Sequence, residues 1–187
     1  MRQLPALALL LAAACSHHPV SPLAGAARRG DLEAIRTLTR GGADPNEPSG
    51  VNHWTPMMHA IHKNQREAAF ALVDNGADIN RACCGGMTPL MMAAGYGQED
   101  LVLGLLERGA DPRRRSGDGA TALDWAITGM PDIDEFTIGK CQTGTVKALL
   151  EKAPDAARDQ PLLTRVAKAL KSCPDIERML ERNRASR

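Results

Sequence analysis

The 187-residue sequence predicts an all-α solenoid of about four two-helix repeats, closed by a degenerate C-terminal helical cap. Aromatic residues make up only 3% of the chain, which disfavours an all-β sandwich. The tripeptide Gly-Ala-Asp recurs at residues 42–44, 76–78 and 109–111. A second marker, Thr followed by Pro or Ala, recurs in the same phase at residues 55–56, 88–89 and 121–122. Two independent markers in one phase indicate internal repeats of about 33 residues.

Composition and charge exclude several classes of protein. The chain is 43% hydrophobic and 24% charged, which is typical of a globular protein. Its 23 Lys and Arg residues against 22 Asp and Glu leave a formal charge of +1, so nucleic acid is not an expected partner. The sequence has no run of eighteen apolar residues, so we expect no permanent membrane-spanning helix.

The N-terminus has the character of a targeting segment. Residues 1–14 are predicted to be a signal peptide, because their apolar core is too short to span a bilayer in the mature protein. Leu11-Ala12-Ala13-Ala14-Cys15 resembles the lipobox of bacterial lipoproteins, in which cleavage before the cysteine exposes it for lipid attachment. Ala12 departs from the aliphatic residue usual there. We predict lipidation of Cys15; ordinary cleavage after Ala14 and a buried N-terminal helix are the alternatives.

The lipobox resemblance implies a location as well. It places the protein in the bacterial cell envelope, facing the periplasm, with a membrane contact through the lipid. Ser16 follows the cysteine instead of the Asp of inner-membrane retention signals, which favours the outer membrane. Residues 15–20 would be a lipidated tether, and the His17–His18 pair within it is interpreted as solvated linker rather than as a metal site.

Each repeat carries signals for two helices. Thr at the turn can cap the first helix, and Pro at the next position suits a first turn that needs no amide donor. Small residues then allow close approach of neighbouring first helices: Ala26, Ala60, Ala93 and Ala126. On the second helices, i, i+3 pairs predict one buried stripe: Ile35 with Leu38, Ala69 with Leu72, and Val102 with Leu105. Gly42, Gly76 and Gly109 are predicted to end these helices in the left-handed conformation.

These residues resemble the ankyrin-repeat family over roughly residues 21–156. Thr88-Pro89-Leu90-Met91-Met92-Ala93-Ala94 stands where the family has T-P-L-H-x-A-A. Val102 to Asp111 matches its V-x-x-L-L-x-x-G-A-D. The expected repeats are residues 21–50, 51–84, 85–117 and 118–156. The resemblance is specific for fold and says little about function.

The fourth repeat departs from the pattern. Leu149 follows Ala126 by twenty-three residues where the other repeats have twelve, so an insertion is expected at about residues 130–144. Val146, Leu149 and Leu150 then restore the buried stripe. Residues 157–187 are predicted to be a C-terminal cap of two helices, one containing Leu162 and Val166 and the other Ile176 and Leu180. Such a cap closes a stack whose repeats cannot bury their apolar faces alone.

Without Cys15 the chain has four cysteines, for which three disulfide connectivities are possible. Cys141 and Cys173 both lie near the start of a second helix, and stacking places such starts side by side. A Cys141–Cys173 bond is therefore the preferred pairing. Cys83 and Cys84 are adjacent at the tip of a loop between repeats. They could form a disulfide with each other, which would close a readily reduced eight-membered ring. We favour an intermolecular disulfide, or two free thiols without a chemical role.

Chemical motifs are scarce. The sequence contains no nucleophile elbow, zinc-protease motif or phosphate loop, so we predict no enzyme activity, no cofactor and no small-molecule substrate. A group of Met and His residues (Met57, Met58, His59, His62, Met87, Met91 and Met92) suits cuprous ion, which makes a periplasmic copper-binding protein the alternative function. Only His59, His62, Met87 and Met92 are expected to face outwards. We favour core and groove packing, with no metal site.

The ankyrin resemblance implies a concave surface made by the first helices and the loops between repeats. That surface binds proteins in the family, so the partner predicted for this chain is another protein, whose identity the sequence does not reveal. The residues expected to bind it, taken position by position, are Arg28, Arg29, Trp54, His59, His62, Lys63, Met87, Met92, Tyr96 and Trp125. Arg28, Arg29 and Lys63 would give a positive rim. The alternative roles are that Trp125 fills the gap beside the insertion and that Trp54 covers the first of the loops between repeats.

These observations predict an envelope-anchored protein–protein interaction module. Its role would be that of a scaffold, a protective factor for an envelope enzyme, or an immunity factor against a delivered toxin.

Overall fold

The computed structural model describes residues 19–130, 141–158 and 166–185. The helices are α1 (Pro22–Arg29), α2 (Leu32–Arg40), α3 (Pro56–His62), α4 (Arg66–Asp74), α5 (Pro89–Tyr96), α6 (Glu99–Glu107), α7 (Ala122–Thr128), α8 (Thr143–Lys152) and α10 (Pro174–Ala185), with 3₁₀ turns η1 (Cys84–Gly86) and η2 (Pro154–Arg158). Residues 166–170 are also helical. The described residues contain no strand, only one isolated bridge between Ser49 and Trp54, which confirms the all-α prediction.

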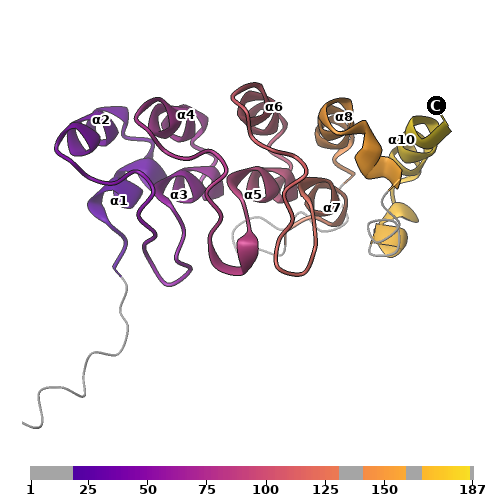
Figure 1. Ribbon diagram of the computed structural model, residues 1–187, viewed down its shortest axis with the longest axis horizontal. Coiled ribbons are helices and arrows are strands. Elements are labelled where there is room, and N and C mark those ends of the chain that lie inside the picture. The colour runs from indigo at the N-terminus through magenta and orange to yellow at the C-terminus, as the bar shows by residue number, and fades with distance from the viewer. Residues whose placement is uncertain (1–18, 131–140, 159–165, 186–187) are drawn as a thin grey trace, which may run out of the picture.

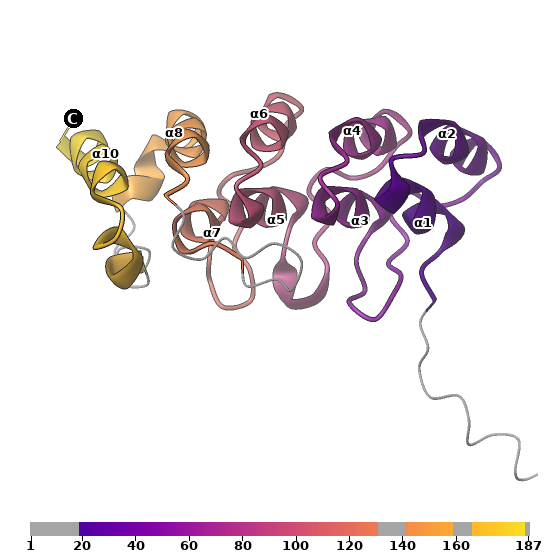
Figure 2. The same cartoon turned by 180° about the vertical axis from the view of Figure 1, so that it is seen from behind.

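The helices form two rows. The first helices of the pairs, α1, α3, α5 and α7, lie side by side, and the second helices, α2, α4, α6 and α8, form an outer row above them (Figures 1 and 2). The loops that join one pair to the next project away from the helices on the side of the first row; residues 41–55, 75–88 and 108–121 are called the first, second and third fingers. No helix among the described residues is long and apolar enough to cross a bilayer.

Side-chain caps start the first helices as the sequence predicts. The hydroxyl of Thr55 accepts the backbone N–H of Met58 at 3.4 Å, and the hydroxyl of Thr88 accepts that of Met91 at 3.3 Å. Thr121 differs because Asp124 follows three residues later. The Asp124 carboxylate accepts both the backbone N–H and the hydroxyl of Thr121, at 2.8 and 2.7 Å. The carboxylate thus takes over the capping role in the fourth repeat.

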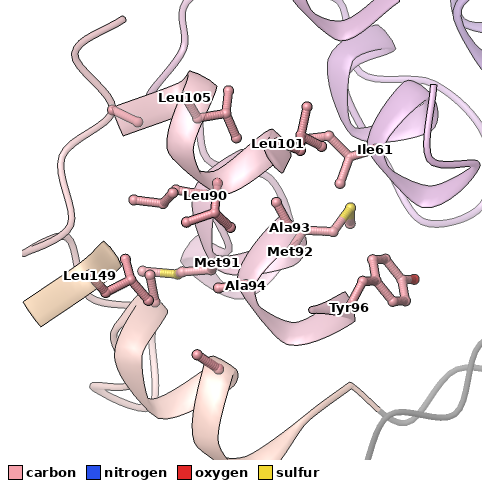
Figure 3. Close-up of a cluster of buried hydrophobic side chains, with 14 of the residues drawn as sticks. Ile61, Leu90, Met91, Met92, Ala93, Ala94, Tyr96, Leu101, Leu105 and Leu149 are labelled. Atoms are coloured by element: carbon pink, nitrogen blue, oxygen red, sulfur yellow. The ribbon is translucent and has the colours of Figure 1, made fainter. Parts of the chain in front are cut away.

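The core is a continuous apolar layer between the two rows. Met91 of α5 points toward Leu149 of α8, and Met92 points toward Ile61 of α3, so α5 packs against both neighbouring repeats (Figure 3). The predicted stripe is buried at Ile35, Ala69, Leu72, Val102 and Leu105. Leu38 is the exception and is only half-buried, because α2 lies at the N-terminal end of its row and packs mainly on α1 and α4. Gly42, Gly76 and Gly109 have φ between +92° and +93°, which confirms the predicted helix ends.

An asparagine ladder joins the second-helix ends of consecutive repeats. The amide nitrogen of Asn46 donates to the Gly76 carbonyl, and its amide oxygen accepts the backbone N–H of Asp78 at 2.7 Å. Asn80 repeats both bonds one unit later, to Gly109 and Asp111. The repeats are therefore held in register by bonds that a single repeat cannot make.

A second set of bonds links the first row. The side-chain amide of Gln98 donates to the Ile61 carbonyl at 2.8 Å, and that of Gln142 donates to the Gly95 carbonyl at 3.2 Å. Each glutamine precedes a second helix and reaches the end of the first helix in the previous repeat. The glutamines thereby satisfy carbonyl groups that a helix end leaves without an intrahelical partner.

The junction after the third repeat is built differently. Arg113 stands where Asn46 and Asn80 stand in their repeats, and its guanidinium binds the Asp155 carboxylate at 2.8 and 3.3 Å. A disulfide joins Cys141, just before α8, to Cys173, just before α10, with Cα atoms 5.5 Å apart. This is the pairing preferred from the sequence. Residues 131–140 of the predicted insertion and Leu162 of the predicted cap lie outside the described residues, as do residues 1–18.

Gly104 in α6 gives a test of packing between the outer helices. A Cβ at this position would collide with the ring of Phe70 from α4, whose face is covered by the Arg108 guanidinium at 4.0 Å. Gly104→Ala gains helix propensity of about 1 kcal/mol, whereas overpacking costs about 1–3 kcal/mol. We expect a net loss in the free energy of unfolding, measured by urea denaturation.

Phe70→Ala supplies the control background for this substitution. There the collision is absent, so Gly104→Ala should raise the free energy of unfolding by up to about 1 kcal/mol. A stabilising effect of Gly104→Ala with Phe70 intact would contradict the packing seen between α4 and α6.

Candidate functional site: a cavity on the concave face

The first helices and the fingers enclose a cavity of about 580 Å³, called the groove. Its walls come from α1, α3 and α5 and from the first two fingers, which project from that row in Figure 1. The residues that line the groove are Val20, Arg28, Gly50, Val51, Asn52, Trp54, His59, His62, Cys84, Met87, Met92, Tyr96 and Met130. Segments far apart in the sequence thus meet at one surface.

Most of the predicted partner-binding residues meet in the groove. The seven that line it are Arg28, Trp54, His59, His62, Met87, Met92 and Tyr96. Arg29, Lys63 and Trp125 do not line it. Trp125 is half-buried in α7 beside Gly95, and its indole nitrogen is buried without a hydrogen-bond partner. That placement agrees with the gap-filling role considered for this residue.

Sequence reasoning missed several groove residues. Val20, Gly50, Val51, Asn52 and Met130 flank the repeat motif, so the family pattern does not assign them to the concave face. Val51 carried a signal, since it is an apolar residue in a loop of polar ones and is 79% exposed. Cys84 was singled out for its thiol and not for its position at the groove.

Aromatic rings form the central wall. The ring centroids of Trp54 and His62 are 5.1 Å apart, and those of His62 and Tyr96 are 5.9 Å apart. A hydrogen bond of 3.0 Å joins Nδ1 of His62 to the Tyr96 hydroxyl. The three rings come from the first finger, α3 and α5. Such fixed amphipathic rings, flanked by the thioethers of Met87 and Met92, are typical of protein-binding surfaces.

The charge of the groove has one sign. Arg28 is exposed and lines it, and the thirteen lining residues include no Asp or Glu. Arg29 and Lys63 do not contribute, so the positive rim predicted from three cations is supplied at the groove itself by Arg28. An acidic group on a ligand is therefore the favoured electrostatic complement.

His59 is buried in the groove wall. Its ring meets the edge of Trp54 at a centroid distance of 5.6 Å, and its Nε2–H donates to the Ser49 carbonyl at 3.3 Å. Burial lowers the pKa of His59 below the ordinary value of 6.5, and the charges of Arg28 and His62 act in the same direction, while the bond to Ser49 opposes them. His59 is thus held neutral.

The expected outward orientation of four copper ligands is wrong for two of them. His59 and Met92 are 5% and 1% exposed, because Trp54 covers the former and Ile61 packs on the latter. His62 already uses Nδ1 to bind Tyr96. The part of the chain that the structure describes also holds no group of three His, Cys, Asp or Glu side chains suited to a metal ion. The copper alternative is therefore not supported.

Acidification tests the buried state of His59. Because its pKa is lowered in the folded protein, the unfolded chain binds more protons below pH about 6.5. The contribution of neutral His59 to stability is complete above that pH and is lost as the pH falls toward the lowered pKa. We expect the free energy of unfolding to decrease over this window. A His59→Gln variant should show a smaller decrease, and an unchanged slope would exclude His59 as its source.

Comparison with known proteins agrees with this architecture. The family model for ankyrin repeats (3 copies) matches residues 23–116. The phosphate system positive regulatory protein PHO81 of Saccharomyces cerevisiae is 35% identical over 66 residues, which cover 35% of this chain and 5% of the yeast protein. That similarity spans a small part of the relative, so it bears on the repeats and not on the relative's regulatory activity. With a family match over half its length, the chain belongs to the ankyrin-repeat family.

Proposed function

We propose that the protein is a non-enzymatic interaction module of the bacterial cell envelope that holds a partner protein in the groove. The observation that carries this proposal is the meeting of Trp54, His62 and Tyr96 around one cavity with Arg28 at its edge. Membership of the ankyrin-repeat family supports the coarser conclusion that the chain binds other proteins.

The groove favours a partner of definite chemistry. Its aromatic and thioether walls suit an apolar side chain, and Arg28 suits an acidic residue next to it. A protein with an acidic edge and an apolar anchor is the proposed occupant. Such a partner fits an envelope enzyme that the module scaffolds or protects, and equally a toxin that it neutralises.

The lipid anchor is the second part of the proposal and rests on the lipobox resemblance at Cys15. The contacts of Pro19 and Val20 support its relevance to binding. The Pro19 carbonyl accepts the backbone N–H of Gly50 at 3.3 Å, and Val20 lines the groove. Four residues of extended chain span at most about 14 Å. A lipid on Cys15 would therefore keep the mouth of the groove close to the bilayer surface.

Removing two aromatic walls tests the groove. Trp54→Ala with Tyr96→Ala should abolish co-purification of the partner from lysates of the source organism, because central Trp and Tyr residues each contribute about 2 kcal/mol or more to an interface. The matched control is Leu103→Ala, which removes a 39% exposed apolar side chain from outer-row helix α6. A band lost in the groove variant and kept in the control supports the proposal. Equal capture by both variants, with unchanged far-UV helicity, refutes it.

Cys15→Ser tests the anchor separately. The lipid attaches through this sulfur, so the variant should move from the membrane fraction to the soluble fraction of the source organism. Metabolic labelling with an alkyne fatty acid should mark the wild type and not the variant. A variant that still sediments with membranes would count against lipidation.

A further inference from the structure

The two cysteines of the second finger are held together as free thiols. Their sulfur atoms are 3.4 Å apart, with Cys84 exposed and Cys83 half-buried. A disulfide needs a sulfur separation of about 2.05 Å, so the pair is close to bonding distance without being bonded. Adjacent residues that bond in this way close an eight-membered ring.

The thiol pair lies in the turn that connects three fingers. The Cys84 thiol donates to the Asn52 carbonyl of the first finger at 3.1 Å. On the other side, the backbone N–H of Gly117 in the third finger donates to the Gly85 carbonyl at 2.6 Å. Gly86 has φ +77° and lies against the Ser116–Gly117 backbone, where a Cβ would crowd the contact. Oxidation of Cys84 would therefore remove its hydrogen bond to Asn52, which joins the first and second fingers. Cys84 also lines the groove.

We propose that Cys83 and Cys84 form a thiol–disulfide exchange site that reacts with low-molecular-weight disulfides and, on closing its ring, breaks the bond that ties Asn52 of the first finger to the second finger. The chemical step rests on the two thiols alone. Its effect on partner binding rests on the proposed function of the groove.

The exchange takes two steps. In the first, the Cys84 thiolate attacks one sulfur of the external disulfide, forms a mixed disulfide and expels one thiolate, which takes up a proton. In the second, the Cys83 thiolate attacks the Cys84 sulfur, closes the ring and expels the other half of the external disulfide as a second thiol. Two protein thiols are oxidised and one external disulfide is reduced to two thiols.

The environments of the two thiols assign their order. Cys84 is exposed and can meet the external disulfide. The pKa of Cys83 is raised to about 12. Burial of the Cys83 thiol is the largest cause, and the hydrogen bond between the two thiols and the negative charge of an ionised Cys84 act in the same direction. In a mixed disulfide, Cys84 has no S–H and cannot ionise. Of the three causes that raise the pKa of Cys83, only burial then remains. Cys83 is thus suited to the second step and not to the first.

Ring closure removes the S–H of Cys84 and with it the donor to Asn52. The first finger then keeps its own bonds, from Ser49 N–H to the Trp54 carbonyl at 2.9 Å and from His53 N–H to the Gly50 carbonyl at 3.0 Å, but loses its thiol tie to the second finger. Asn52 and Trp54 both line the groove, so the change occurs at its wall.

The test uses the full chain carrying Cys15→Ser, treated with glutathione disulfide and analysed by intact mass. We expect a product that has lost two hydrogen atoms and carries no glutathione, with the Cys141–Cys173 bond unchanged. Adding Cys83→Ser should trap one glutathione on Cys84. Adding Cys84→Ser should slow the reaction by about tenfold or more, because the remaining thiol, Cys83, is half-buried and less accessible to the external disulfide. Stable glutathione adducts on the chain with both thiols, disulfide-linked dimers or no reaction would each overturn the exchange site.

Amide hydrogen exchange of the same samples tests the effect on the finger. Residues 50–54 should exchange at least about threefold faster after ring closure, whereas the amides of α5 should not change. Unchanged exchange in residues 50–54 would overturn the finger tie even if the ring forms. Because neither measurement involves a partner, failure of the groove proposal would leave both results intact.

Discussion

The stack depends on side chains of one repeat that complete the backbone hydrogen bonds of its neighbour. Asn46 and Asn80 do so along the second-helix ends, and Gln98 and Gln142 do so along the first row. A single repeat would lack these bonds and would leave its apolar stripe exposed. The same bonds fix the spacing of the first helices, and that spacing sets the width of the groove. Fold and candidate site therefore share one constraint.

The side chains that line the groove come from several elements that the stack places side by side. Trp54 belongs to the first finger and His62 to α3, eight residues later in the same repeat, whereas Tyr96 belongs to α5 of the next repeat. The ring of Tyr96 joins this surface because α5 packs beside α3 of the preceding repeat. The dithiol turn lies at the edge of that surface and joins the fingers in the same way that the asparagines join the helix ends.

The sequence predicts most of this arrangement because the repeat motif assigns each position to a helix, a turn or the concave face. Seven of the ten predicted groove residues line the cavity for that reason. The exposure of His59 and Met92 was mispredicted, since it depends on Trp54 and Ile61 in neighbouring elements, which periodicity does not encode. The asparagine ladder was not predicted: Asn46 and Asn80 occupy equivalent positions of consecutive repeats, but their bonds follow only from the approach of consecutive loops. Trp125 precedes, by a few residues in the sequence, an expected insertion that has no counterpart in the other repeats, so the repeat motif does not assign its surroundings.

The replacement of asparagine by Arg113 makes one joint of the stack different in kind. Neutral amide bonds respond little to dissolved ions, whereas the exposed pair of Arg113 and Asp155 is screened as ionic strength rises. The covalent link between Cys141 and Cys173 lies beyond that joint and is indifferent to salt. A rise in ionic strength therefore weakens this contact between the third finger and η2, while the asparagine bonds and the disulfide are left largely unchanged.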